Sequence, residues 1–222
     1  MKKSFFVLAV SFLLIGSSFA QVKISGGVLG GLNLANVTTD PDAGDVLDNL
    51  TGFGAGAVFN FEFPSGFCIQ AEPMYLQAGT KASNTSGGVT EELKIKANYI
   101  SLPVLFMYAF QTGKNQVQPY IFAGPSLGLL VSANLSATVS NNNASVSGDY
   151  DVKDSLKTTD FSALFGAGII IPAGSSKIFL EGRYSLGLSD INNTKVLFGG
   201  SAVTIKTKGI QFFAGIRFPF GS

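Results

Sequence analysis

Hydrophobic and polar residues alternate along eight segments of this chain. A period of two residues is typical of a β-strand, because successive side chains point to opposite faces. The clearest alternation is in 52–63, where Phe53, Phe59 and Phe61 are separated by glycine, asparagine and other residues. The β-branched, aromatic and glycine content of the segments favours strands over helices. The eight predicted strands are 23–36, 52–63, 67–81, 93–110, 119–131, 161–171, 177–189 and 207–220.

The third predicted strand, 67–81, has an irregular pattern. Gln70 and Glu72 lie on one face, but the alternation changes phase around Pro73. Because proline cannot donate a hydrogen bond to a neighbouring strand, its position inside a strand indicates a β-bulge. We therefore expect a bulge at Pro73.

The connections between these segments alternate in length. The short ones are 64–66, 113–115 and 173–176, and the long polar ones are 37–50, 82–92, 132–160 and 190–206. Transmembrane β-barrels have short periplasmic turns and longer extracellular loops, and each of their strands carries an apolar lipid-facing side. The pattern predicts an all-β, eight-stranded antiparallel transmembrane β-barrel with four long extracellular loops. An even number of strands then places both termini in the periplasm.

The N-terminal residues 1–20 resemble a secretory signal peptide. Lys2 and Lys3 precede an apolar run, and Ser18 and Ala20 supply the small residues of a cleavage site. The run is shorter than the roughly 17–25 residues that a spanning helix needs. We expect the mature barrel domain, 21–222, to begin at Gln21, and mass spectrometry of the mature protein would test this cut.

Composition agrees with an exported membrane barrel. Hydrophobic residues make up 46% of the sequence and charged residues 13%, yet no apolar stretch after Ala20 reaches helix-spanning length. A closed barrel is the other structure that satisfies its backbone in lipid. Removing two lysines with the signal leaves thirteen basic against fourteen acidic residues, a formal charge of −1, which gives no indication of nucleic-acid binding. The expected location is the outer membrane, in contact with its lipid.

Six charged residues fall on the predicted lumen-facing side of the strands. Because an unpaired buried charge is costly, we interpret them as an ion-paired structural network that fills a narrow lumen. The alternative is that the carboxylates act as a catalytic acid and base. The six residues are Lys23, Glu62, Glu72, Glu181, Arg183 and Arg217.

Other chemistry has little support in the sequence. The sequence contains no histidine, which removes the commonest general base and metal ligand, and its one cysteine, Cys68, has no partner. Asp40, Asp42, Asp45 and Asp48 could ligate calcium, but the EF-hand pattern fails at two of its positions. We therefore expect no catalytic residues, no cofactor and no specific metal site, and we predict that the protein is not an enzyme.

The C-terminal segment carries a candidate assembly signal. Gly215, Phe218 and Phe220 have the spacing of the terminal-strand signal that the barrel insertion machinery reads, although Phe213 stands where a polar residue is usual. The alternative is that Phe218 and Phe220 belong to the aromatic girdle at the membrane surface.

Several motifs together resemble the PorT-related outer membrane β-barrel domain family, which is common in the Bacteroidetes. They are Gly30-Gly-Leu-Asn33, Glu72-Pro-Met-Tyr75 with Gly79, Tyr99-Ile-Ser-Leu-Pro103, Pro119-Tyr-Ile-Phe-Ala-Gly-Pro125 and Leu180-Glu-Gly-Arg-Tyr184 with Gly187-Leu188. The resemblance implies an outer membrane barrel without carrying over a catalytic residue, and PorT itself is associated with protein secretion and gliding.

The sequence leaves several functions open. The long polar loops favour a non-enzymatic surface or envelope role, in which they bind an extracellular or envelope protein that the sequence does not identify. The resemblance suggests an accessory role in a secretion or gliding apparatus. A lipid-acting membrane enzyme would need a carboxylate and serine constellation that the sequence does not reveal, and a soluble ligand-carrying barrel would not explain the apolar outward faces.

Overall fold

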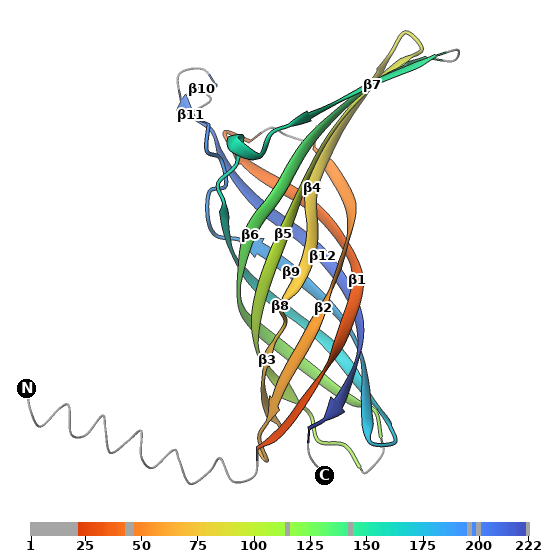
Figure 1. The fold of residues 1–222 in the computed structure, drawn as a ribbon, viewed down its shortest axis with the longest axis vertical. Coiled ribbons are helices and arrows are strands. Elements are labelled where there is room, and N and C mark those ends of the chain that lie inside the picture. The colour runs from red at the N-terminus through yellow and green to blue at the C-terminus, as the bar shows by residue number, and fades with distance from the viewer. Residues whose placement is uncertain are drawn as a thin grey trace, which may run out of the picture.

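Antiparallel β-strands form nearly all of the computed structural model, which describes residues 22–42, 47–113, 116–141, 144–194, 197–198 and 201–220 (Figure 1). The predicted signal peptide, 1–20, lies outside the described residues. The strands are β1 (Lys23–Asp40), β2 (Asp48–Glu62), β3 (Phe67–Ala71), β4 (Met74–Ser86), β5 (Val89–Ala109), β6 (Gln118–Asn141), β7 (Ser145–Asp151), β8 (Thr159–Ala173), β9 (Ser176–Gly187), β10 (Leu197–Phe198), β11 (Ser201–Ala202) and β12 (Thr204–Pro219), with a short 3-10 helix η3 (Lys153–Ser155).

The sheet closes on itself as a barrel. Each wall strand pairs with its neighbours in the sequence, and β1 pairs with β12 from Ser25↔Pro219 to Asp40↔Thr204. In the part of the chain that the structure describes, eight strands form the wall when β3 and β4 are counted as one interrupted strand. This confirms the predicted eight-stranded antiparallel fold. We call the end with the β2–β3 and β8–β9 turns the turn end, and the opposite end the loop end.

The predicted bulge at Pro73 is wrong. The register against β2 is the same before and after the interruption, at Ala71↔Phe59 and Met74↔Gly56. Neighbouring backbone groups satisfy the gap, because the Ala57 N–H donates to the Pro73 carbonyl. Side chains at even-numbered positions face the lumen both before and after Pro73, so the alternation of inward and outward side chains does not change phase there either.

Irregularities in register occur elsewhere in the wall. The β2–β4 register shifts between Asn49 and Gly54, and the β5–β6 register shifts between Asn98 and Tyr99.

Two of the four links predicted as long loops are largely strand. Gly87 and Gly88 alone connect β4 to β5, and their positive φ angles of 59° and 79° match a tight hairpin turn. The predicted 132–160 link begins as a continuation of β6 and returns as β7. The sequence pattern missed these extensions because strands outside lipid need no apolar outward face.

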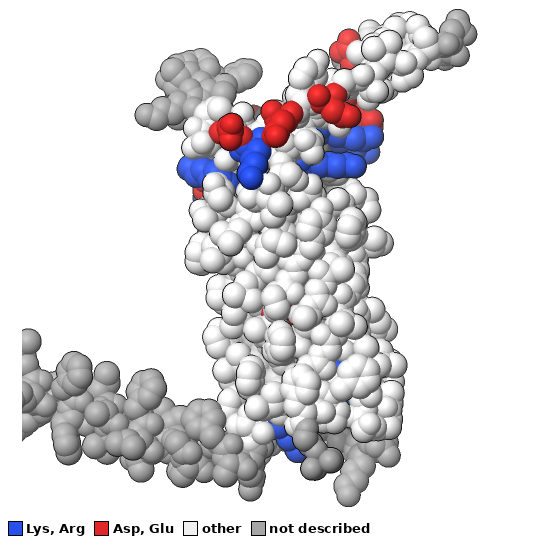
Figure 2. Space-filling view, viewed as in Figure 1, with Lys and Arg blue, Asp and Glu red and all other residues white. Residues whose placement is uncertain are grey.

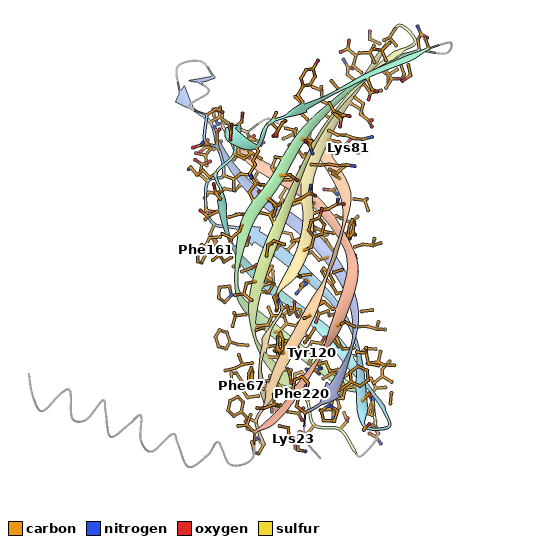
Figure 3. All side chains as sticks on the ribbon, in the orientation of Figure 1. Lys23, Phe67, Lys81, Tyr120, Phe161 and Phe220 are labelled. Carbon is orange, nitrogen blue, oxygen red and sulfur yellow. The ribbon has the colours of Figure 1, made fainter. Side chains whose placement is uncertain are left out.

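Neighbouring apolar side chains face opposite sides of the wall. Val28 is 59% exposed on the outer face, whereas Leu29 is 5% exposed in the lumen. Phe67, Phe161 and Phe220 are exposed on the outside and Tyr120 lies inside (Figure 3). The lumen is more apolar than the sequence pattern predicts. A buried cluster fills it: Leu29, Val58, Cys68, Met74, Leu105, Met107, Tyr120, Phe122, Leu164, Ile170, Phe179 and Phe213.

Candidate functional site

Arg183 is the centre of a charged cluster inside the barrel. Its Nη1 donates to Oε2 of Glu72 at 2.6 Å and lies 3.5 Å from Oε1 of Glu181. All three side chains are fully buried. The guanidinium also stacks on the ring of Phe213, 4.2 Å from its centroid. Phe213, which departs from the expected terminal-strand pattern, thus has a structural role as an inward-facing partner of Arg183.

Hydrogen bonds extend this cluster from β9 to β3, β6 and β12. Gln70 donates to Glu72 at 2.7 Å and accepts from Arg217 at 2.9 Å. Tyr120 donates to Oε2 of Glu181 at 2.7 Å. Two arginines therefore balance two glutamates in the lumen. Sequence reasoning missed Tyr120, although its position between outward-facing Ile121 and Pro119 already placed it on the inner side.

The remaining two of the six predicted residues lie apart from this cluster. Glu62 pairs with Lys177 at 2.5 Å near the turn end, where both side chains are about one third exposed. Lys23 is exposed at the same end (Figure 3) and lines the same hollow as Glu62 and Lys177. Lys177 was not among the predicted network residues, although its position on the inward-facing side of its strand could have indicated it.

Packed side chains separate two hollows in the described part of the lumen. Above the charged cluster lies a cavity of about 40 Å³ lined by Asn33, Tyr99 and Asp160 among others. At the turn end a wider hollow of about 780 Å³ is lined by Lys23, Glu62, Cys68 and other residues. The apolar cluster and the ion pairs lie between them.

We expect purified protein in planar bilayers to give no stable ion conductance, because side chains fill the lumen of a barrel of this size. Single-channel recording tests this expectation. Reproducible open-channel steps would contradict a closed lumen.

The surroundings of the buried carboxylates favour a structural role over a catalytic one. Glu72 and Glu181 both lie against Arg183, which compensates their charge and holds them in place. Among the residues that the structure describes, no group of three or more His, Cys, Asp or Glu side chains could hold a metal ion. The acidic segment considered for calcium includes Asp45, which lies outside the described residues. No helix in the described ranges is long and apolar enough to cross a membrane.

The residues of the predicted insertion signal lie at the turn end of β12. Phe218 and Phe220 are exposed on the outer face, and the ring of Phe220 covers Gly26 on the neighbouring strand β1. A side chain at Gly215 would meet the ring of Phe179 inside the lumen. Gly215 therefore makes room for an inward aromatic side chain, whether or not it is also part of a signal.

Replacing Phe218 and Phe220 together with alanine separates the two interpretations of this segment. If the aromatics only contact lipid, the variant should reach wild-type abundance in the membrane with reduced stability in detergent. If they form a recognition signal, the variant should accumulate unfolded in the periplasm yet fold into liposomes in vitro. Surface accessibility of a loop tag at wild-type abundance would contradict the signal.

A sheet projects from the loop end of the barrel (Figure 1). It consists of the ends of β4, β5 and β6 together with β7, and β7 pairs with β6 from Asn134↔Asp151 to Ser140↔Ser145. In the described chain β7 has no second neighbour, and residues 82–86 of β4 pair only with β5. The projecting sheet therefore has two open edges.

The two faces of the projecting sheet differ in polarity. The face that continues the lumen side carries exposed apolar residues, of which Val146 and Tyr150 are 73% and 62% exposed. The opposite face carries charged and hydroxyl side chains such as Lys94, Asp149 and Ser136. The exposed apolar residues of this face are Leu93, Ile95, Val139, Val146 and Tyr150, and Leu135 and Ala137 lie half-buried among them.

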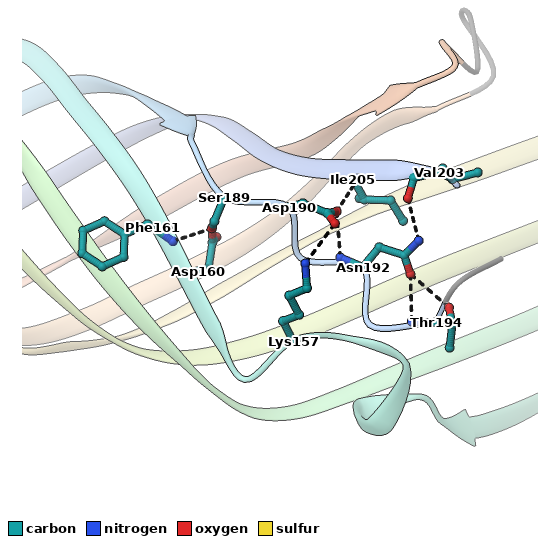
Figure 4. Close-up of polar contacts among 9 residues, drawn as sticks. All are labelled: Lys157, Asp160, Phe161, Ser189, Asp190, Asn192, Thr194, Val203 and Ile205. Carbon is teal, nitrogen blue, oxygen red and sulfur yellow. Dashed lines mark hydrogen bonds and ion pairs between the residues drawn. The ribbon is translucent and has the colours of Figure 1, made fainter. Parts of the chain in front are cut away.

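Side-chain hydrogen bonds hold residues 190–194, which follow β9, against the β7–β8 connection (Figure 4). Asp190 accepts from the backbone N–H groups of Ile205 and Asn192 and pairs with Lys157 at 3.0 Å. Partial burial raises the pKa of Asp190, but these hydrogen bonds and the charge of Lys157 outweigh it, so the pKa lies below its usual value. Asp190 is therefore ionised, and its carboxylate holds these residues in place.

Closure, lipid-facing apolar side chains and a charged interior together define a transmembrane β-barrel. The chain belongs to the outer membrane protein beta-barrel domain family, whose model matches residues 19–193. This membership gives an outer membrane location. No curated protein matches the sequence.

Solved structures of small outer membrane barrels are similar over most of the chain. Neisserial surface protein A is 15% identical, covers 88% of this chain and 97% of its own, and has a TM-score of 0.47. Ail of Yersinia pestis is 18% identical, with 87% and 98% covered and a TM-score of 0.38. OprG of Pseudomonas aeruginosa is 11% identical, with 90% and 96% covered and a TM-score of 0.44.

Proposed function

We propose that this protein is a non-enzymatic outer membrane barrel that presents its projecting sheet at the cell surface to bind an extracellular or envelope protein. The observation that carries the proposal is the exposed apolar face of that sheet. Outside the lipid, contiguous exposed apolar side chains mark an interaction surface. The open edges of β7 and β4 offer backbone groups to the same partner.

This proposal includes an orientation. The loop end would lie outside the cell, and the turn end, where β1 begins and β12 ends, would face the periplasm. The short turns and the extended hairpins support this direction, because barrels of this kind carry their longer connections outside. A tag inserted between β6 and β7 should be labelled by antibody on intact cells. A tag accessible only after permeabilisation would reverse the orientation.

Site-specific photocrosslinking on intact cells tests the interaction surface. A photoreactive residue at Val146, on the apolar face, should give a discrete crosslinked product, while one at Ser147, on the opposite face of the same strand, should not. Adding Tyr150→Asp should abolish the product, because a charge replaces the exposed aromatic side chain. Equal products from both positions, or none from Val146, would contradict the proposal.

The alternative of an accessory role in secretion or gliding is supported by the resemblance to PorT alone. Its test is separate from the crosslinking experiment. Loss of secretion in a deletion strain, together with recovery of secretion components with the tagged protein, would favour it. Unchanged secretion would remove it.

A further inference from the structure

The outer face of the barrel changes from apolar to basic at the loop end. Along β12 the outward positions run through Phe212 and Ile210 to Lys208 and Lys206. Along β5 they run from Ile100 through Asn98 to Lys96 and Lys94, and along β4 they reach Lys81. Three strands therefore carry lysine beyond their lipid-facing side chains. We call Lys81, Lys94, Lys96, Lys206 and Lys208 the lysine belt.

Figure 2 shows the same change over the visible face. Basic residues gather directly above an uncharged wall, and acidic residues lie mainly beyond them. Lys81 stands at this boundary in Figure 3. The belt therefore lies at the depth where lipid headgroups meet the wall, because the acyl chains contact the apolar band. Lysine suits this position, since its long stem can lie along apolar surface while its ammonium reaches the headgroups.

The described chain compensates these charges only in part, because Asp48 lies opposite Lys81 in the β2–β4 register. Lys94 and Lys81 lie directly opposite each other in the β4–β5 register, an arrangement of like charges that destabilises a sheet. Lys94 pairs with Glu92 at 2.6 Å, and in the described ranges the other four belt lysines have no ion pair. A repulsive cluster of this kind is favourable where an anionic partner from outside the chain binds it.

The two rims of the barrel are not equivalent. At the turn end the outward side chains are aromatic, including Phe61, Phe67 and Phe218. The charged residues described there, Lys23, Glu62 and Lys177, line the hollow at the mouth of the lumen. Among the residues that the structure describes, lysines therefore border the lipid-facing band at the loop end and aromatic residues border it at the turn end, which indicates that the two leaflets differ in the ligand they offer.

We propose that the lysine belt binds the phosphate groups of lipids in the leaflet that borders the loop end. An ammonium group and a phosphate form a charge-assisted hydrogen bond, which is stronger than a neutral one. The position favours a lipid over a soluble anion, because the belt adjoins the acyl-chain surface on the outside of the wall. The proposal does not depend on which protein binds the projecting sheet.

Lipid binding by matched double variants tests the belt. Detergent-purified protein is mixed with diphosphorylated lipid A, and bound lipid is measured by native mass spectrometry. Lys94→Gln/Lys96→Gln should weaken binding about thirtyfold, at roughly 1 kcal/mol for each lysine near an anionic surface. Lys23→Gln/Lys177→Gln removes the same charge at the opposite end of the barrel, where both lysines line the turn-end hollow, and should bind as the wild type does. Lys94→Arg/Lys96→Arg should retain binding.

Two further measurements identify the ligand. The first uses lipid A that lacks phosphates. The wild-type protein should bind this lipid as weakly as the Lys94→Gln/Lys96→Gln variant binds diphosphorylated lipid A. Binding to the wild type should fall as salt is raised, which keeps the proposal testable if a belt variant fails to fold. Equal lipid retention by the belt variant and the control would overturn the proposal. Full displacement of the lipid by inorganic phosphate at equal phosphate concentration would also overturn it, in favour of a soluble anion.

Discussion

Replacing Arg183 with methionine is expected to lower the free energy of unfolding by about 3–5 kcal/mol, since it strands two carboxylates in the barrel interior. Arg183 is the group that lies within ion-pair distance of both Glu72 and Glu181 in the described structure. Methionine keeps an unbranched side chain of related shape, so the loss reports charge more than volume. Urea unfolding of the protein in detergent or lipid vesicles measures it.

Two control variants distinguish an uncompensated charge from lost packing. Lys177→Met removes the partner of Glu62, but that pair is about one third exposed, so the cost should be about 0–1 kcal/mol. Adding Glu72→Gln and Glu181→Gln to Arg183→Met should recover much of the stability, because neutral side chains tolerate burial better than unpaired charges. An Arg183→Met variant as stable as Lys177→Met would contradict the buried network.

Replacing Gly31 with alanine is the second change with a large expected effect, about 1–3 kcal/mol of destabilisation from overpacking. A Cβ atom at Gly31 would fall on the carbonyl oxygen of Phe212 and lie 2.8 Å from Cα of Phe213. Both are backbone atoms of the adjacent strand, so relief requires a shift of the β1–β12 pair that closes the barrel. Unfolding in detergent and heat-modifiable mobility on gels would report the loss.

The adjacent residue provides the matched control for this substitution. Gly30 faces the other side of the wall, where an added Cβ would lie 3.7 Å from the carbonyl oxygen of Gly54, an ordinary contact. Gly30→Ala should therefore leave stability unchanged or slightly higher, because alanine has less backbone freedom to lose on folding. Equal losses from both substitutions would indicate a general intolerance of the strand rather than a specific close approach.

The wall of the barrel could be predicted from the sequence because lipid imposes a simple pattern. Alternation located all eight wall strands and the closed fold, since each strand must present apolar side chains outward. Strand segments outside the lipid do not need apolar outward side chains, and the sequence pattern did not predict them. Residues 82–86 and 145–151 are strand, but they lie beyond the lipid-facing band and do not show that signal.

The inside of the barrel was predicted only in part. Placing Glu72, Glu181 and Arg183 on the inner side follows from their position in the alternation, and the structure brings them together. The alternation also places Tyr120 and Phe213 on the inner side, but an aromatic side chain does not by itself indicate that it contacts a buried charge. Their contacts with Glu181 and Arg183 depend on the barrel register, which a single strand does not reveal.

The charged cluster also constrains the order in which the barrel can form. Arg183 and Glu72 are 111 residues apart in the sequence, and Arg217 and Gln70 are 147 apart. A partly inserted sheet would expose these groups to hydrocarbon without their partners, at a cost of several kcal/mol for each charge. The cluster therefore disfavours strand-by-strand entry, and we expect crossing of the bilayer and the meeting of β1 with β12 to occur as one cooperative event.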